Sequence, residues 1–489
     1  MEWVAKAVLL GWLPLILLLF LLLPARRAVV AGLVTSWLFL PVYGFDLPLV
    51  PNYTKMSATC YAIILGALIL DPKSRLLNFK PMWIDIPIVL WCLSPFFTSL
   101  SNGIGDDGGF YDGASALVGR TISDALPYLI GRLYFQNPDD AKELCLGFIV
   151  GGLVYVPLCL YESKFSPQLH AMVYGMRPFW DFAQAYRWGG WRPSVFLAHG
   201  LATGIWMATA TAMTIWMWRT RAIERIFGIP IVWAVPVLLI TTILCRSTGA
   251  ILLLMVMLTC MFCVKSLGSK VLLQLLLFGL PLYLLARATG VFDGVAFTEA
   301  LRTLPLMEHR GASLEFRLVH ENAIIAHTAG ERPLLGWGGW GRAFDVRVEE
   351  YDMMAVSDSL WIIAFGQNGW FGLIAMYSLY LLPPILLLVK MTPAQWSDKR
   401  YASVTGLAMV TVIYAADSFL NAMDNPVFVV TIGAVAGMAA TLSRKRAVKR
   451  PAENKRPWTE PTGPRSRPAS ADDLPPRRPG REGPIGGTP

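Results

Sequence analysis

The sequence predicts an all-α polytopic membrane protein. Three observations lead to this fold class: 55% of the residues are apolar, only 15% are charged, and long apolar runs recur along the chain. The runs are about 15 to 22 residues long, close to the length that a helix needs to cross the hydrocarbon core of a bilayer. Most of the chain is therefore expected to lie in the membrane.

About twelve to thirteen transmembrane helices are expected. The first apolar run is too long for the core of a signal peptide and is followed at once by another run, so it is expected to be a retained helix. The expected helices lie at roughly residues 4–24, 28–43, 56–70, 84–100, 114–134, 142–160, 196–218, 229–245, 249–264, 270–288, 370–389, 402–420 and 425–442.

The positive charges of the short connections predict the orientation of these helices. Loops such as 44–55 and 99–113 are nearly free of lysine and arginine, whereas alternate loops are basic. Because cytoplasmic loops carry the excess of positive charge, the N-terminus and the longest loop are expected outside and the C-terminus inside. The basic loops carry Arg26, Arg27, Lys73, Arg75, Lys80, Arg219, Arg221, Arg225, Lys265, Lys270, Lys390, Lys399 and Arg400.

The chain divides into four parts. Residues 1–288 hold the first ten helices and an outer loop at 161–195, and residues 289–357 form a large, partly helical outer loop. A loop of that length indicates a binding or reaction site, because simple connections are much shorter. Residues 358–442 hold a re-entrant or interfacial helix and the last membrane helices. Residues 443–489 form a basic, Pro-rich cytoplasmic tail that is expected to be disordered.

The start of this tail is strongly basic, which has two explanations. The positive charges are expected to anchor the last membrane helix, and contact with anionic lipid is the alternative. The seven cysteines all lie in apolar runs, so no disulfide framework is implied. Cys260 and Cys263 form a lone CxxC without a second pair, and His320 and His327 are two turns apart. Neither a metal site nor a cofactor is expected.

The positive charges of the outer loops are almost exclusively arginines. Loop 161–195 carries Arg177, Arg187 and Arg192, and the long loop carries six arginines and no lysine, among them Arg342. A guanidinium is favoured where phosphate or carboxylate oxygens are bound in a bidentate manner. The alternative is internal pairing, because the long loop also contains many acidic residues.

Three further positions are candidates for the site. Arg246 interrupts two apolar runs, and a charge at the rim of a helical bundle indicates function unless it snorkels to the headgroups. The segment 315–327 (EFRLVHENAIIAH) predicts an amphipathic helix on which Arg317 and His320 can face one ligand. Gly336 and Gly338 satisfy GxGxxG by chance, because no βαβ unit is available. They indicate a tight turn whose backbone approaches either a ligand or the bundle.

Four short patterns lie between about residues 190 and 380. The first is 245–252 (CRSTGAIL), a polar arginine turn before a helix of small residues, and the second is 192–200 (RPSVFLAHG), which includes His199. In the third, Phe316 and Arg317 precede a helix and then 332–338 (RPLLGWG). In the fourth, Ser359 is followed by nine residues, Gly369, two residues and Gly372. In these patterns the chain resembles the bacterial O-antigen ligase and polymerase superfamily of membrane glycosyltransferases.

The resemblance implies a GT-C-like fold in the bacterial inner membrane and a reaction at its outer face. The donor would be a glycan on polyprenyl diphosphate, and the acceptor a sugar hydroxyl on a glycan or a lipid core. Arg246 and Arg317 would stabilise the leaving diphosphate. The family has His at position 358, where this chain has Asp358, which would accept the hydroxyl proton or orient His320. The alternative role of Asp358 is to cap the helix that follows.

The remaining candidates are assigned to substrate binding: Arg177, Arg187, Arg192, His199, Gly336, Gly338, Arg342 and Ser359. The expected partners, besides donor and acceptor, are membrane lipids and other polysaccharide-assembly proteins. No nucleic acid is expected as a partner. Two alternatives remain open. A lipid-linked glycan transporter or flippase would also have many helices and intramembrane arginines, but internal repeats are not evident. A non-catalytic scaffold would use the Pro-rich tail for binding. Whether the reaction is ligation or polymerisation is left open.

Overall fold

The computed structural model describes residues 2–47, 50–103, 107–178, 185–303 and 308–453. It divides into two units, Met1–Arg444 and Lys445–Pro489, and the helical bundle belongs to the first unit. The described residues are predominantly helical, with four short two-stranded hairpins, which confirms the all-α class. The hairpins are β1–β2 (Gly44–Leu47, Val50–Thr54), β3–β4 (Tyr186–Arg187, Gly190–Trp191), β5–β6 (Arg225–Ile226, Ile229–Pro230) and β7–β8 (Arg347–Val348, Met353–Met354).

Each expected membrane helix coincides with a helical segment. These are α1 (Glu2–Leu22), α2 (Ala25–Phe39), α3 (Lys55–Ile69), α4 (Ile86–Asn102), α5 and α6 (Phe110–Arg120, Leu126–Tyr134), α7 (Pro138–Phe165), α9 (Gly200–Arg219), α10 (Ala234–Leu244), α11 (Thr248–Ser266), α12 (Val271–Ala288), α15 (Leu360–Lys390), α17 (Ala402–Asp417) and α18 (Pro426–Glu453). Short helices α8 (Leu169–Tyr174) and α16 (Pro393–Trp396) lie in connections.

Six of the described helical segments are long and apolar enough to cross a membrane, and four shorter apolar helices lie beside them. The chain is accordingly a helical membrane protein. The helix α9, which the sequence predicts at 196–218, is not among these six, although it is buried on nearly all sides. It is rich in Ala, Thr and Gly. Small residues allow close helix packing, and a helix that does not face lipid has no need of long apolar side chains.

The expected span at 114–134 is a helix with a π-helical turn at Thr121–Ala125 between α5 and α6. This turn places the carboxylate of Asp124 inside the bundle, where it accepts hydrogen bonds from Trp91 Nε1 (3.3 Å) and Arg120 (3.5 Å). A carboxylate inside a membrane bundle is costly unless it is paired. The π turn therefore satisfies a buried charge by changing the direction in which its side chain leaves the helix.

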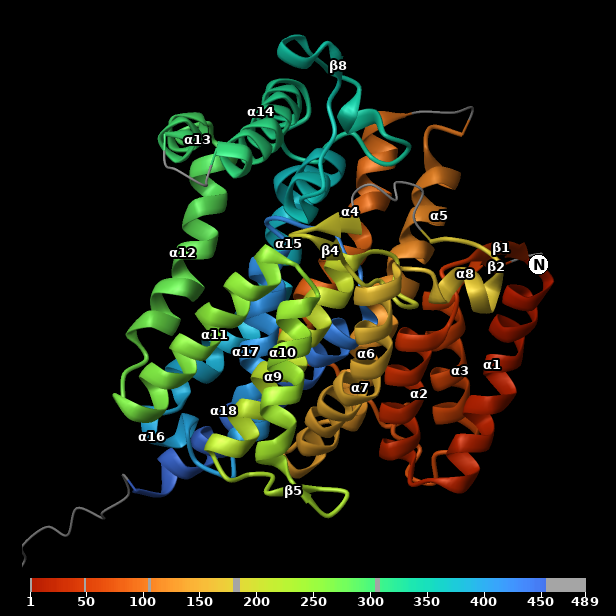
Figure 1. Cartoon of the computed structure of the whole chain (residues 1–489), viewed down its shortest axis with the longest axis vertical. Helices are drawn as coiled ribbons and strands as arrows, with labels where there is room; N and C mark the ends of the chain where they lie inside the picture. Colours follow the sequence, from red (N-terminus) through yellow and green to blue (C-terminus); the bar gives the residue numbers. More distant parts are fainter. Residues whose placement is uncertain (1, 48–49, 104–106, 179–184, 304–307, 454–489) are drawn as a thin grey trace, which may run out of the picture. The chain divides into compact units, whose positions relative to one another are not determined.

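The long loop between α12 and α15 is partly helical. It contains α13 (Val295–Arg302) and α14 (Glu308–Glu331), which lie with β7–β8 at one end of the bundle (Figure 1). The hairpin β5–β6 and helix α16 lie at the opposite end (Figure 1). At the C-terminus, α18 continues to Glu453, past the end expected at 442, and residues 454–489 of the expected tail lie outside the described residues.

A break in α15 joins the long loop to the bundle. The segment expected to form an interfacial helix followed by a separate span is one element, interrupted at Gly369 (φ 59°, ψ −158°). The turn 333–338 enters this break and exchanges four backbone hydrogen bonds with it: Trp337 N to Gly366 O (2.9 Å), Gly338 N to Gln367 O (2.8 Å), Trp370 N to Pro333 O (2.9 Å) and Phe371 N to Leu334 O (3.0 Å). The turn thus satisfies the polar groups that the break exposes.

The glycines at this junction are needed for close backbone approach. A Cβ on Gly336 would lie 2.6 Å from the backbone N of Asn368, and one on Gly369 would lie 2.4 Å from the backbone C of Leu334. The turn therefore approaches the bundle, which is one of the two explanations offered for Gly336 and Gly338. A Cβ on Gly338 would lie 2.9 Å from Nη2 of Arg342, and the N–H of Gly338 donates to α15 at Gln367 O. These contacts account for both glycines without a ligand.

Replacing Gly369 by alanine is expected to destabilise the protein. The new side chain would be strained at this φ and ψ and would clash with the turn, which should lower the free energy of unfolding by at least about 2 kcal/mol. The check is thermal unfolding in detergent. Gly119→Ala is the control, because nothing lies within 4 Å of a Cβ there and the residue is helical. Equal stability of the two variants would contradict this account of the junction.

Candidate functional site

Two arginines meet where the β3–β4 hairpin touches the turn between α10 and α11. Arg246 sits in this turn with a left-handed backbone (φ 49°), and its Nη1 donates to the carbonyl of Trp191 (2.6 Å). Its guanidinium lies so close to Gly190 that a Cβ there would be 2.2 Å from Nη2. Arg192 Nη2 in turn donates to the carbonyl of Arg246 (3.3 Å). The hairpin and the turn therefore position both guanidinium groups together.

The segment 192–200 is bound by Glu162, a buried residue near the end of α7. Its carboxylate accepts hydrogen bonds from the backbone N–H groups of Leu169 (2.8 Å), Ser194 (2.9 Å) and Val195 (2.7 Å). Val195 has a positive φ of 55°, which is unfavourable for a β-branched residue. The carboxylate therefore holds a strained turn in place. Sequence reasoning missed Glu162 because it lies at the end of an apolar run.

His199 ends this segment and caps α9. Its Nδ1 accepts a hydrogen bond from Leu201 N (3.0 Å), so the neutral ring carries its proton on Nε2. Burial, the largest cause, and the positive charges of Arg192 and Arg187 together lower the pKa of His199 to about 4. The charge of Arg317 also lowers this pKa, and that of Asp358 raises it. His199 is therefore neutral at pH 7 and lies within the electrostatic reach of arginines from the β3–β4 segment and from α14.

Arg317 and Asp358 form an ion pair whose charges also act on His199. Arg317, on α14, donates through Nη1 to the carbonyl of Leu420 (3.0 Å) and through Nη2 to Asp358 Oδ2 (3.4 Å). The side chain of Asp358 is 68% exposed and that of Arg317 is 33% exposed. Ser359, and not Asp358, is the N-cap residue of α15. The carboxylate of Asp358 is thus accessible to a ligand and is oriented by Arg317.

These residues are named here the arginine cluster: Arg187, Arg192, His199, Arg246, Arg317 and Asp358. They come from the β3–β4 hairpin, the α9 cap, the α10–α11 turn, α14 and the approach to α15. The cluster combines four guanidinium groups with one exposed carboxylate. Such an arrangement suits a ligand with several negatively charged oxygens next to a group that loses a proton.

A buried ion pair supports the cluster. Arg287, at the end of α12, donates to Glu321 Oε2 (3.0 Å), and both side chains are almost completely buried. Glu321 also accepts a hydrogen bond from the hydroxyl of Ser359, and Arg287 donates to Asn322 Oδ1 (2.6 Å). Burial raises the pKa of Glu321, whereas the hydrogen bond from Ser359 and the charge of Arg287 lower it. Ser359, expected at the substrate, is instead buried in the join between α12, α14 and α15.

His320 has a structural position rather than one beside Asp358. Its buried ring packs against Phe316 and Tyr351, with ring centroids 4.2 Å and 5.3 Å away. Its Nδ1 accepts a hydrogen bond from Val356 N (3.2 Å), and burial lowers its pKa. The neutral ring therefore holds the segment that leads to Asp358. These contacts do not favour His320 as a base oriented by Asp358.

Two other expected arginines have different surroundings. Arg342 donates to Asp112 on α5 (3.3 Å), which also accepts a hydrogen bond from Trp340 Nε1 (2.6 Å). Its ionic partner therefore lies on α5, on a helix that contributes nothing to the arginine cluster. Arg177 is exposed in the segment after α8, next to residues that lie outside the described ranges. Among the described residues, no group of three or more His, Cys, Asp or Glu side chains is placed to hold a metal ion.

An apolar groove of about 410 Å³ lies between α12 and α15. It is lined by residues such as Pro281, Leu285, Trp370 and Tyr377. The hydroxyl of Tyr377 is 2.7 Å from that of Ser418, in the same connection whose Leu420 carbonyl binds Arg317. Tyr377 of the groove and Arg317 of the cluster therefore contact the same segment after α17.

Comparison with known proteins gives no assignment. No model of a known protein family matches the chain, and no curated protein matches its sequence. The functional evidence is accordingly the cluster and its surroundings.

Removing one partner of the buried pair is expected to be strongly destabilising. Glu321→Gln leaves the buried guanidinium of Arg287 without its counter-charge, which should cost about 3 to 5 kcal/mol. Thermal unfolding checks this. Arg347→Gln is the control, because Arg347 pairs with Asp352 on the exposed surface of the same loop and its loss should cost under about 1 kcal/mol. Similar losses for both variants would exclude the supporting role of the buried pair.

Arg187→Gln is expected to raise the pKa of His199 from about 4, because it removes a neighbouring positive charge. The pKa should stay below 6.5, since burial is the larger cause. Because the folded pKa is depressed, stability linked to His199 is complete above about pH 6.5 and is lost as the pH falls toward 4. The pH dependence of diethyl pyrocarbonate labelling at His199, followed by mass spectrometry, measures the shift. An unchanged profile would place Arg187 outside the cluster.

Proposed function

We propose that the chain is a membrane glycosyltransferase that transfers a glycan from polyprenyl diphosphate to a sugar hydroxyl. The observation that carries this proposal is the arginine cluster, in which guanidinium groups from distant segments gather beside the exposed carboxylate of Asp358. The four short sequence patterns, which resemble those of O-antigen ligases and polymerases, add to it. The cluster offers what a diphosphate leaving group and a hydroxyl nucleophile require.

In the proposed reaction, the acceptor hydroxyl oxygen attacks the anomeric carbon of the donor sugar. The bond between that carbon and the diphosphate oxygen breaks, and the electron pair leaves with the diphosphate. The hydroxyl proton passes to the carboxylate of Asp358, which is exposed and held by Arg317. The neutral, buried ring of His320 takes no part in the proton transfer and positions the segment before Asp358.

The arginines stabilise the charge that develops on the diphosphate. Arg246 is positioned by the carbonyl of Trp191, which leaves its positive charge in place. Arg317 is positioned by the carbonyl of Leu420 and by the exposed carboxylate of Asp358, which compensates part of its charge. Each charge-assisted hydrogen bond contributes about 1.5 to 3 kcal/mol, so two of them formed in the transition state raise the rate by about 10² to 10⁴. Arg187 binds the donor, and the buried guanidinium of Arg192 adds to the positive potential.

The apolar groove between α12 and α15 is assigned to the lipid of the donor. Its walls are apolar side chains, and it is joined through Tyr377 and Ser418 to the connection that holds Arg317. An isoprenoid chain would lie there while the diphosphate reaches the cluster. This placement agrees with a chain of about twelve to thirteen spans in the bacterial inner membrane and a GT-C-like arrangement, with the long loop outside.

The test is release of polyprenyl diphosphate from a lipid-linked oligosaccharide by the purified, reconstituted protein without nucleotide sugar. Asp358→Asn should lower the acceptor-dependent rate by at least about 10²-fold, because the general base is lost. Arg317→Ala should lower it by about 10- to 10²-fold. Arg347→Ala and Asp352→Asn are matched controls, because this exposed pair lies in the same loop, and both should retain the parental rate.

Unchanged release in Asp358→Asn would remove Asp358 from the mechanism. The absence of release with any donor and acceptor, together with movement of the lipid-linked glycan between leaflets, would identify a transporter instead. Binding of the glycan without release or movement would identify a scaffold.

A further inference from the structure

A basic pocket of about 430 Å³ lies at the end of the bundle opposite α14. It is formed by the start of α2, the segment 73–82, the end of α6 and the start of α7. Five of its lining side chains are cationic and one is a carboxylate: Arg26, Lys73, Arg75, Lys80, Arg132 and Asp140. None of these residues belongs to the arginine cluster or to the proposed reaction.

The three arginines of this pocket are paired with carboxylates. Arg26 forms an ion pair with Asp140, Arg75 with Asp71 (2.8 Å) and Arg132 with Asp85 (2.7 Å). Lys73 and Lys80 are exposed, and neither has a carboxylate within ion-pair distance among the described residues. The charges of the three arginines are therefore compensated by carboxylates. The two exposed lysines, which have long, flexible side chains, supply a surplus of two positive charges.

An apolar groove continues from this pocket along the bundle. It lies between α2 and α7, has a volume of about 290 Å³ and is lined by residues such as Val34, Thr35 and Val150. Its end is marked by Arg27, which donates to Glu143 (3.3 Å). Arg26 lines the pocket and Arg27 lines the groove, and their partners Asp140 and Glu143 are one helical turn apart on α7. The two features therefore meet at the first turns of the same two helices.

We propose that the pocket and groove bind an anionic phospholipid of the cytoplasmic leaflet. The phosphate of the headgroup binds to Lys73 and Lys80, and one acyl chain lies in the groove between α2 and α7. Charge complementarity favours an anionic headgroup, and the adjoining apolar groove favours a lipid over a soluble phosphate. Leu77, which is 73% exposed between the two lysines, would lie among the lipid chains. The assignment to this leaflet rests on the orientation predicted from the basic loops.

The experiment titrates the purified full chain in detergent with phosphatidylglycerol and measures the dissociation constant by native mass spectrometry. Lys73→Gln/Lys80→Gln is expected to weaken binding about 30-fold, because each surface lysine contributes about fivefold. Both side chains are exposed, so the fold should be unaffected. Thr35→Trp, at an exposed position of the groove, should weaken binding about tenfold or more by occupying the place of the acyl chain.

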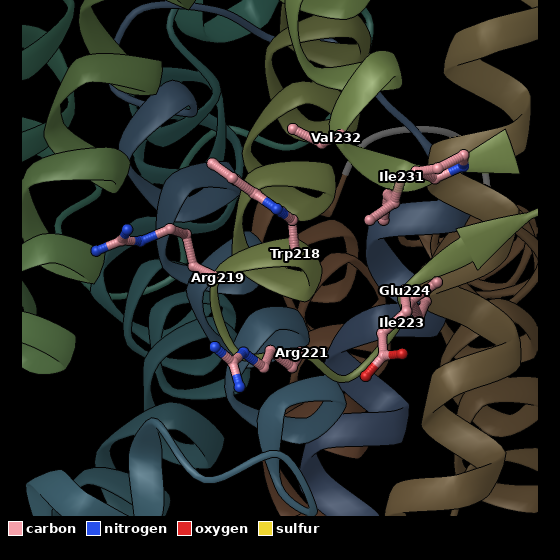
Figure 2. A pocket seen from close by; sticks show the side chains of 8 residues that line it. Trp218, Arg219, Arg221, Ile223, Glu224, Ile231 and Val232 are labelled. Atoms are coloured by element: carbon pink, nitrogen blue, oxygen red, sulfur yellow. The ribbon is translucent and has the colours of Figure 1, made fainter.

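Matched controls remove the same charge or add the same ring elsewhere. Arg219→Gln/Lys399→Gln removes two positive charges from the same end of the bundle, and Leu252→Trp adds an indole at an exposed position of α11. Arg219 lines a separate pocket of about 500 Å³, in which the guanidinium groups of Arg219 and Arg221 and the carboxylate of Glu224 do not converge (Figure 2). Both controls should retain the parental dissociation constant for phosphatidylglycerol.

Three outcomes would overturn the proposal. Equal loss of binding in the two charge variants would show a general effect of membrane charge. If phosphatidylcholine bound as tightly as phosphatidylglycerol, the lysines would not select an anionic headgroup. Inorganic phosphate that competes fully with the lipid, together with no effect of Thr35→Trp, would identify a soluble phosphate compound as the ligand. Selective loss in the lysine and Thr35 variants alone supports the lipid site.

Discussion

The arginine cluster depends on positive charge that is held in place and only partly compensated, by the exposed carboxylate of Asp358. Arg246 is held by the carbonyl of Trp191 and Arg317 by the carbonyl of Leu420. A carbonyl oxygen accepts a hydrogen bond and fixes the guanidinium plane, but it carries no net charge. The carboxylates that stabilise this region, Glu162 and Glu321, lie beneath the cluster and are directed at backbone N–H groups or at Arg287. The guanidinium of Arg246 therefore keeps its positive potential, whereas that of Arg317 is shared with the exposed carboxylate of Asp358.

The opposite end of the bundle uses arginine differently. There Arg75 and Arg132 are each bound directly by a carboxylate, Asp71 or Asp85, and their charge is largely compensated. The Arg132–Asp85 pair joins α6 to the start of α4, whereas the Arg75–Asp71 pair lies within the segment that follows α3. Such pairs attract an anion weakly, and the surplus charge comes from lysines, whose side chains are long and flexible. The same residue type thus has a structural role at one end and a proposed chemical role at the other. The acceptors differ: Arg75 and Arg132 meet buried carboxylates. Arg246 meets a carbonyl, and Arg317 meets a carbonyl and the exposed carboxylate of Asp358.

The sequence was sufficient for the helices and for most of the cluster. Apolar runs marked the membrane segments. Arg246 was identifiable because it interrupts two apolar runs, and Arg317 because it lies three residues before His320 on a predicted amphipathic helix. Glu162 and Arg287 were missed because an ionisable residue at the end of a helix is ordinarily a rim residue. Their importance comes from partners in other segments: Glu162 reaches Val195, and Arg287 reaches Glu321. A sequence without aligned relatives contains no signal for such pairings. The outer location of the loop remains a prediction from charge.

The docking of turn 333–338 into the broken helix α15 divides the long loop into two parts. The turn is bound to the bundle through backbone hydrogen bonds, and the helix α14 is bound through side chains. Lifting the turn would break the four hydrogen bonds and leave backbone groups of α15 without partners. Helix α14 is joined to the bundle by side chains, through the ion pairs Arg287–Glu321 and Arg317–Asp358. In the proposed reaction, a lipid-linked donor would enter laterally from the bilayer, along the groove between α12 and α15. The long loop above it would stay fixed to the bundle at turn 333–338.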